Sequence, residues 1–178
     1  AALVEEYRAR AEPLAARPAG RLATTFDRNA TAGGDHALGR LIADAQLAAT
    51  RAQGARIAFT NPGGIRAELR PGPDGAVTFG DVFTVQPFGN TLVTLTLSGA
   101  QLRTLLEKQW SARSYRARIL QPSRGLSYAW DPTRPVGERV VTESLRLDGR
   151  RIDPAGDYRI TVNDFLAGGG DGFTVLRD

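Results

Sequence analysis

The fold of the C-terminal part of the chain is decided by residues 158–173, YRITVNDFLAGGGDGF. Apolar side chains alternate with polar ones at Tyr158, Ile160 and Val162, a pattern that predicts a strand with one apolar face. The three consecutive glycines that follow, residues 168–170, have no Cβ atoms. The backbone can therefore adopt positive φ there, and another group can approach it closely.

Two interpretations of this glycine segment stay open on the residues alone. The simpler one is a tight turn that sends Phe165 and Phe173 into the core and uses Asp171 to cap the bend. In the alternative, an aromatic surface and an anionic acceptor, Phe165 and Asp171, line one small pocket.

Composition sets limits on the class of protein. The chain has 178 residues, of which 42% are hydrophobic and 24% charged, values typical of one globular domain with a substantial core. It contains no cysteine and a single histidine, His36, which excludes Cys-ligated metal sites and argues against a His-dependent catalytic triad. Because the chain begins at Ala1 and contains no Met, we expect it to be a fragment or a mature form of a longer protein.

Charge and hydropathy restrict the partners. The net charge is +4 and the pI is about 10.1, which permits anionic ligands. The arginines are spread along the chain instead of forming one basic stretch, so we consider nucleic acid an unlikely partner. No apolar run approaches the roughly 18 residues of a membrane-spanning helix, so we expect no membrane span.

Helices and strands are interspersed along the sequence. We expect helices over residues 3–16, 36–52 and 99–110, with Asp35 and Ser98 as N-caps and His36 exposed to solvent. We expect strands over residues 22–26, 56–59, 93–97, 127–130, 140–147 and 158–163. A hairpin turn at Asp148-Gly149 should join the last two of these strands.

Two further glycine turns carry candidate binding groups. Asn61-Pro-Gly-Gly-Ile-Arg66 follows a buried strand, so that backbone amides and a guanidinium could converge on an anion. The alternative is a glycine turn with a solvated arginine. Gln86-Pro-Phe-Gly-Asn90 is a second turn that combines an aromatic ring with glycine.

Taken together, these motifs resemble one family. The similar segments are ALGRLIADAQ (37–46), NPGGIRAEL (61–69), FGDVFTVQPFGNTLVTLTLSGAQLRTLLE (79–107), LQPSRGLSYAWD (120–131) and YRITVNDFLAGGGDGF (158–173). In this order they resemble the C-terminal, substrate-specificity domain of the 5′-nucleotidases and UDP-sugar hydrolases. The resemblance implies an α+β fold, a layered α/β domain with mixed sheets.

The resemblance also implies a domain organisation. Residues 1–20 would form a connector helix and residues 21–178 the C-terminal domain. The family's N-terminal metallophosphatase domain, which binds two divalent metal ions and carries the catalytic residues, lies outside this chain and would be its partner. We therefore expect no catalytic residue, metal site or cofactor in this chain. By the same resemblance the protein would be extracellular, periplasmic or at the cell surface.

Binding roles follow from the resemblance position by position. Phe88 and Phe165 match the two rings that sandwich the base, and stacking on a base contributes about 1–3 kcal/mol. Asp171 would accept hydrogen bonds from the ribose hydroxyls, Arg66 would contact the ribose or phosphate side, and Asn61 would reach the base edge.

Further positions match less directly. Asn90 and Gly125 correspond to family positions near the pocket, and Arg28 is the candidate for a further substrate arginine before the helix over residues 36–52. Pro62 stands where the family commonly has glycine, and Arg40 where many members have asparagine.

The sequence thus predicts a nucleotide- or nucleoside-binding specificity domain of a metal-dependent phosphohydrolase that binds, but does not hydrolyse, its ligand when isolated. The alternative is a non-enzymatic binding or structural module that retains the fold. Nucleic-acid binding driven by the high pI is a third hypothesis.

Overall fold

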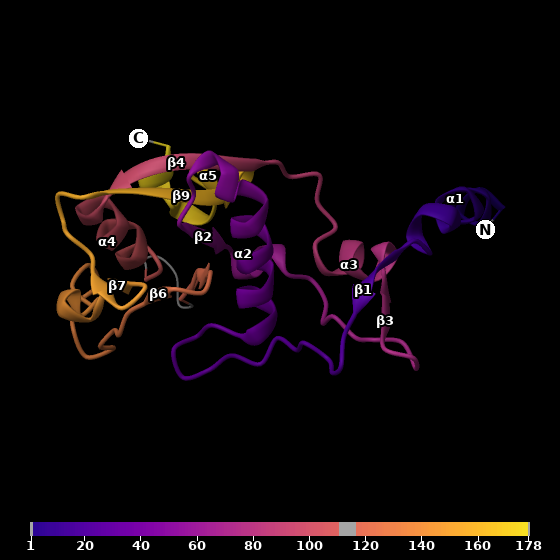
Figure 1. Ribbon diagram of the computed structural model, residues 1–178, viewed down its shortest axis with the longest axis horizontal. Helices are drawn as coiled ribbons and strands as arrows, with labels where there is room; N and C mark the ends of the chain where they lie inside the picture. The colour runs from indigo at the N-terminus through magenta and orange to yellow at the C-terminus, as the bar shows by residue number, and fades with distance from the viewer. Residues whose placement is uncertain (1, 111–116, 178) are drawn as a thin grey trace. The chain divides into compact units, whose positions relative to one another are not determined.

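The computed structural model describes residues 2–110 and 117–177 (Figure 1). Their contacts divide the chain into two compact units. Unit 1 comprises Ala1–Arg28 and Gly63–Gly89, and unit 2 comprises Asn29–Pro62 and Asn90–Asp178. In the part of the chain that is described, no helix has the length and apolar character needed to cross a bilayer.

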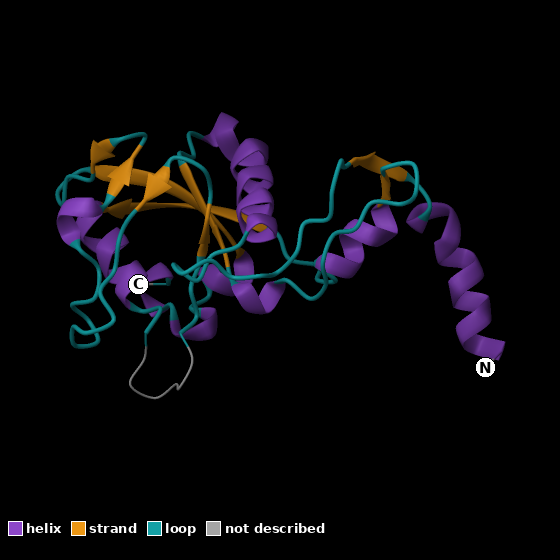
Figure 2. Cartoon of the chain, turned by 90° about the horizontal axis from the view of Figure 1, so that it is seen from below, coloured by secondary structure: helices purple, strands orange, loops and turns teal. Residues whose placement is uncertain are grey.

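Unit 2 is built on a four-stranded mixed sheet, whose strands lie side by side in Figure 2. The strand order is β4-β9-β2-β5, with bounds Leu92–Ser98 (β4), Asp157–Asn163 (β9), Ile57–Thr60 (β2) and Gln121–Pro122 (β5). The central pair, β2 and β9, is parallel, whereas β4 pairs with β9 and β5 with β2 in the antiparallel sense. The expected mixed sheet is therefore confirmed.

Helices cover both faces of this sheet. Ile160 and Val162 of β9 are fully buried and pack in one core cluster with the leucines of α4 (Gly99–Glu107). Ala58 of β2 points the other way and packs against α2 (Ala37–Thr50) in a second cluster. Because side chains alternate between the two faces of a strand, one face of the sheet packs on α4 and the other on α2. The layered α/β architecture is confirmed.

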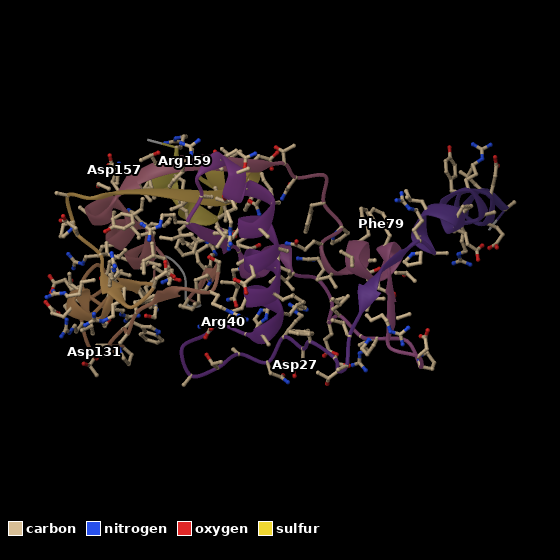
Figure 3. The ribbon with its side chains drawn as sticks, in the orientation of Figure 1. Asp27, Arg40, Phe79, Asp131, Asp157 and Arg159 are labelled. Carbon is tan, nitrogen blue, oxygen red and sulfur yellow. The ribbon has the colours of Figure 1, made fainter. Side chains whose placement is uncertain are left out.

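The start of α2 differs from the expectation. Asp35 is not the cap, because its carboxylate accepts hydrogen bonds from Thr31 Oγ1 at 2.5 Å and from Arg40 Nε. Burial alone would raise the pKa of Asp35, but these hydrogen bonds hold it below its ordinary value. Arg40 projects from the first turn of α2 (Figure 3).

The N-cap of α2 is His36 instead. Its Nδ1 accepts the Gly39 N–H at 3.0 Å, and its own N–H donates to Gln121 Oε1 at 2.9 Å. His36 is 6% exposed, so the expectation of a solvated histidine is wrong. The Asp35 carboxylate is thus occupied by its neighbours Thr31 and Arg40, whereas His36 is also held by Gln121, 85 residues away, a contact that leaves no local pattern.

The expected N-cap of α4, Ser98, is confirmed, and it forms a capping box with Gln101. Ser98 Oγ accepts the Gln101 N–H at 3.2 Å, and Gln101 Oε1 accepts the Ser98 N–H at 2.9 Å. The helix ends at Glu107, three residues before the predicted end at Trp110.

A smaller three-stranded antiparallel sheet replaces the long strand predicted over residues 140–147. Its strands are β6 (Leu126–Ser127), β7 (Arg146–Leu147) and β8 (Arg150–Arg151). Asp148 and Gly149 have φ angles of 51° and 77° and form the expected hairpin turn. The turn joins β7 to β8, however, and not to the strand that ends at Asn163. The long strand fails because residues 142–144 form a 3-10 turn.

Unit 1 contains a two-stranded antiparallel sheet and two helices. The elements are α1 (Ala2–Ala15), β1 (Pro18–Arg21), β3 (Ala76–Thr78) and α3 (Phe79–Val85). The strand predicted over residues 22–26 lies earlier, and Phe26 forms only a bridge with Leu69. Phe79, in the first turn of α3 (Figure 3), stacks on Phe83 with ring centroids 6.3 Å apart.

Candidate functional site

Two asparagines meet where the parallel strands β2 and β9 end. The pairing of Ile57 with Ile160 puts the carboxyl ends of both strands at one edge of the sheet. Asn61 follows β2 and Asn163 ends β9, and Asn163 Nδ2 donates to Asn61 Oδ1 at 3.2 Å. This edge, at the carboxyl ends of parallel strands, is where ligands bind in open α/β sheets.

The short helix α5 (Asp164–Ala167) starts at this edge. Asn163 is its N-cap, with Oδ1 accepting the Leu166 N–H at 2.8 Å. Leu166 is fully buried, which anchors the helix to the core, whereas Phe165 is 48% exposed. A large apolar ring is thus held at the surface beside the polar strand ends.

The glycine segment shapes the surroundings of this ring. A Cβ atom on Gly170 would lie 2.5 Å from the Phe165 carbonyl oxygen and 2.6 Å from two atoms of the Phe165 ring. Gly169 has a φ of 84°, in the left-handed region that favours glycine. One glycine therefore makes space for the Phe165 ring itself, and another allows the chain to turn.

Asp171 lies next to the strand ends in a strained backbone conformation. Its φ is 55°, which is uncommon for a residue with a side chain. Its Oδ2 accepts a hydrogen bond from Asn61 Nδ2 at 2.9 Å, and its carbonyl oxygen accepts one from Arg118 Nη1 at 2.8 Å. Strain of this kind persists where the surroundings fix the residue, and it occurs often at functional sites.

The structure corrects one part of the simpler interpretation of the glycine segment, the burial of Phe165, whereas the pocket of the alternative interpretation stays a prediction. Phe173 has no exposed surface and belongs to the core, as predicted. Phe165 is exposed, so the turn does not bury both rings. Sequence reasoning missed Asn163 and Arg118 as partners in this site. The N-cap preference of asparagine could have pointed to Asn163, whereas the Arg118 contact spans 53 residues and leaves no local pattern.

A cavity of about 500 Å³ borders Asp171. It is lined by Arg103, Glu107, Lys108 and Arg118 among others. The Glu107 carboxylate accepts the N–H groups of Arg139 and Val140 at 3.0 and 2.7 Å. These bonds hold Glu107 as a structural acceptor for the backbone of a neighbouring segment.

Three of the predicted residues belong to unit 1. Arg28 Nη1 donates to the Arg66 carbonyl oxygen at 3.2 Å, which brings these two arginines together. The Arg66 N–H donates to the Val85 carbonyl oxygen at 2.8 Å, so the arginine pair adjoins the end of α3. Phe88 follows α3 and is 46% exposed.

The remaining two predicted residues lie in unit 2. Asn90 is exposed in the segment that precedes β4. Gly125 has a φ of 100°, and its carbonyl oxygen accepts the Asp148 N–H at 2.9 Å. Asp148 also pairs with Arg56, which precedes β2. Gly125 therefore lies near the start of β2, whereas Asn61 follows its end.

The residues that the structure describes offer no metal site. No three His, Asp or Glu side chains gather among them in an arrangement that could hold an ion. Divalent metal ions in phosphohydrolases require such donor sets. The described residues therefore do not fit the role of metal ligands.

Comparisons with curated proteins give relatives over most of the chain. Endonuclease YhcR of Bacillus subtilis is 34% identical over 93% of this chain, which covers 13% of the relative. The trifunctional nucleotide phosphoesterase protein YfkN of the same organism is 39% identical over 79% of this chain, which covers 10% of the relative. The chain thus spans about a tenth of the length of these relatives.

A solved structure agrees with the fold. The crystal structure of a 5′-nucleotidase precursor from Thermus thermophilus superimposes with a TM-score of 0.81 at 36% identity, covering 98% of this chain and 35% of that one. The family described as 5′-nucleotidase, C-terminal domain, matches residues 15–178. The chain belongs to the family of 5′-nucleotidase C-terminal domains.

Proposed function

We propose that this chain is the nucleoside-recognition part of a metal-dependent 5′-nucleotidase-type phosphohydrolase, and that by itself it binds nucleosides or nucleotides without hydrolysing them. The observation that carries the proposal is that one short segment contains both an exposed aromatic ring, Phe165, and a carboxylate held by a hydrogen bond, Asp171. These two groups match the two halves of a nucleoside.

The chemistry of each half supports the assignment. A nucleobase has two apolar faces, and its stacking on an exposed phenylalanine contributes about 1–3 kcal/mol without requiring a particular base. The vicinal hydroxyls of ribose are donors, and a carboxylate is the side chain that accepts from two donors at once. Phe88, Arg66 and Arg28 lie in unit 1, and their proposed roles, a second stacking ring and two guanidinium groups for an anionic ligand, rest on the family resemblance.

Hydrolysis requires groups that we assign to another part of the protein. In the proposed full-length enzyme, two divalent metal ions in an N-terminal metallophosphatase domain would activate water for attack on phosphorus. The metal-ion donor set is absent among the described residues, so no chemical step is assigned to them. Residues 1–20, which include α1, would connect the two domains.

Calorimetry with adenosine and with 2′,3′-dideoxyadenosine tests the binding site. Phe165→Ala should weaken the affinity for both nucleosides about 5- to 150-fold, since stacking of about 1–3 kcal/mol is lost. Asp171→Asn should weaken adenosine binding about fivefold and leave dideoxyadenosine unchanged, because a neutral acceptor is weaker by about 1 kcal/mol. Asparagine also tolerates the positive φ at this position.

Phe83→Ala is the matched control, because Phe83 is an exposed phenylalanine of α3 outside the proposed site. It should bind both nucleosides as the parent chain does. Equal affinities for the parent chain, Phe165→Ala and Asp171→Asn would show that the site is wrongly assigned.

A turnover assay tests the division of labour. The purified chain should release no phosphate from AMP with or without added Mg²⁺ or Mn²⁺. Phosphate release that persists in the presence of a chelator would contradict the proposal.

The alternative, a non-enzymatic module that retains the fold, differs in what precedes Ala1 in the gene. A metallophosphatase domain encoded upstream supports the enzyme, and its absence supports the module.

Secretion of the full-length protein, which we also propose from the family, is measured by cell fractionation.

A further inference from the structure

Three polar side chains form a continuous hydrogen-bond network from the end of β9 to Asp171. Asn163 Nδ2 donates to Asn61 Oδ1 at 3.2 Å, and Asn61 Nδ2 donates to Asp171 Oδ2 at 2.9 Å. Asn163 and Asn61 are 3% and 5% exposed, so their bonds are shielded from water. In such surroundings a lost partner is costly, because water does not replace it.

The N-terminus of α5 determines which group donates and which accepts in each hydrogen bond of this network. An asparagine amide can present either its oxygen or its NH₂ to a neighbour, so its orientation must be deduced from its partners. The Leu166 N–H of α5 can only donate, and it donates to Asn163 Oδ1 at 2.8 Å. The NH₂ of Asn163 must therefore face Asn61, which turns the Asn61 oxygen toward Asn163 and the Asn61 NH₂ toward Asp171.

The side-chain NH₂ of Asn61 is therefore a donor held in a fixed position next to the Asp171 carboxylate. The backbone of Asp171 is independently fixed at a φ of 55°, with its carbonyl oxygen accepting from Arg118. With the backbone fixed, the bond from Asn61 to Oδ2 sets the rotation of the carboxylate. The amide of Asn163 determines whether Asn61 offers Asp171 a donor or a repelling oxygen.

We propose that Asn163 is a positioning residue, which orients the Asp171 carboxylate through Asn61 and so sets the preference for ligands that carry ribose hydroxyls. The inference rests on the proposed function of Asp171 as the acceptor for these hydroxyls. Asn163 itself, buried behind Asn61, acts through the two side chains and contacts no ligand.

A purely structural role for Asn163 as the N-cap of α5 is the competing explanation. Asn163→Ser separates the two, since serine caps a helix as well as asparagine does but lacks the amide NH₂ that reaches Asn61. Ser98→Ala is the matched control, because it removes the N-cap of α4 and touches none of the three side chains.

The first measurement needs no ligand. The side-chain amide signal of Asn61 in a ¹⁵N-correlated NMR spectrum, assigned with Asn61→Ala, reports on the bond to Asp171. In the parent chain and in Ser98→Ala the two Asn61 amide protons should exchange slowly with water. In Asn163→Ser they should shift and exchange at least tenfold faster, since Asn61 loses the partner that fixes its orientation.

The second measurement is the ratio of adenosine affinity to 2′,3′-dideoxyadenosine affinity, taken by calorimetry. Asn163→Ser should lower this ratio about three- to tenfold, the size of one charge-assisted hydrogen bond that is partly lost. Any contact of Asn61 with the base edge weakens for both ligands alike and cancels in the ratio. A mere loss of folded protein or of α5 would weaken both ligands together, and Ser98→Ala should change neither.

The two measurements distinguish a failure of the proposed function from a failure of the role proposed for Asn163. A parent chain that binds no nucleoside, or binds both equally, refutes the proposed function and with it the ribose preference. A parent chain that prefers adenosine, with an Asn163→Ser variant that keeps both the ratio and the slow Asn61 exchange, overturns the role of Asn163 and leaves the proposed function intact.

Discussion

Replacing Gly170 with alanine should displace the Phe165 ring and abolish most of the nucleoside affinity. The added Cβ would lie 2.6 Å from Cε1 and Cζ of that ring and 2.5 Å from the Phe165 carbonyl oxygen. Rotation of the ring about its side-chain torsions relieves the first contact but leaves the second, because a carbonyl oxygen belongs to the backbone. The α5 helix must therefore shift together with the ring that it carries.

Two magnitudes follow from this geometry. Forcing a methyl group into a filled space costs about 1–3 kcal/mol of folding free energy. Loss of the stacking surface removes about 1–3 kcal/mol of binding free energy, so adenosine affinity should fall about 5- to 150-fold. Both effects arise from one methyl group that itself contacts no ligand.

Gly168→Ala is the matched control within the same glycine segment. Its added Cβ would lie 3.4 Å from the Asp164 carbonyl oxygen, at the edge of ordinary contact, and Gly168 has a φ of −76° that alanine adopts readily. Urea unfolding and adenosine calorimetry should therefore give values near those of the parent chain. The reasoning is refuted if Gly170→Ala matches Gly168→Ala in both measurements.

Two further predictions concern the packing of unit 2. His36→Ala should lower the free energy of unfolding by about 1 kcal/mol, because the Gly39 N–H loses its N-cap acceptor, whereas His36→Asn retains an oxygen acceptor and most of the stability; equal losses in urea unfolding would contradict the capping role. Burial raises the pKa of Tyr128 to about 12, against the opposing hydrogen bond with Gln109. The folded chain thus keeps a proton that the unfolded chain releases near pH 10, so the associated stability is fully present below about pH 10 and is lost as the pH rises toward about 12. Urea unfolding across this range should show a steeper loss for the parent chain than for Tyr128→Phe, and parallel curves would rule the prediction out.

The elements that sequence alone predicts are those with local signals. Strand β9 follows from the alternation that ends at Val162, and the start of α4 follows from Ser98 and Gln101, which bond each other three residues apart. The hairpin turn at Asp148-Gly149 is local in the same sense. Its partner strand β8 was missed because two residues carry too little pattern to be recognised.

The contacts of the candidate site, in contrast, join residues that are far apart in the sequence. Asn61 and Asp171 are 110 residues apart in the chain, and they meet because β2 and β9 pair in parallel. The residue pattern of a strand does not say which distant strand it pairs with, so neither β2 nor β9 reveals this pairing by itself. The family resemblance names both residues as ligand contacts, but it says nothing of the bond between them.

That bond constrains the role which the resemblance gives to Asn61. The Asn61 oxygen accepts from Asn163, and one of the two N–H groups of its amide donates to Asp171. A contact with the base edge would therefore have to use the second N–H of the same amide. Recognition of the base and orientation of the ribose acceptor would then depend on one side chain, so a substitution of Asn61 changes both at once. Phe165 and Asp171, for which we propose contacts with different halves of a nucleoside, are the positions at which the two contributions can be measured separately.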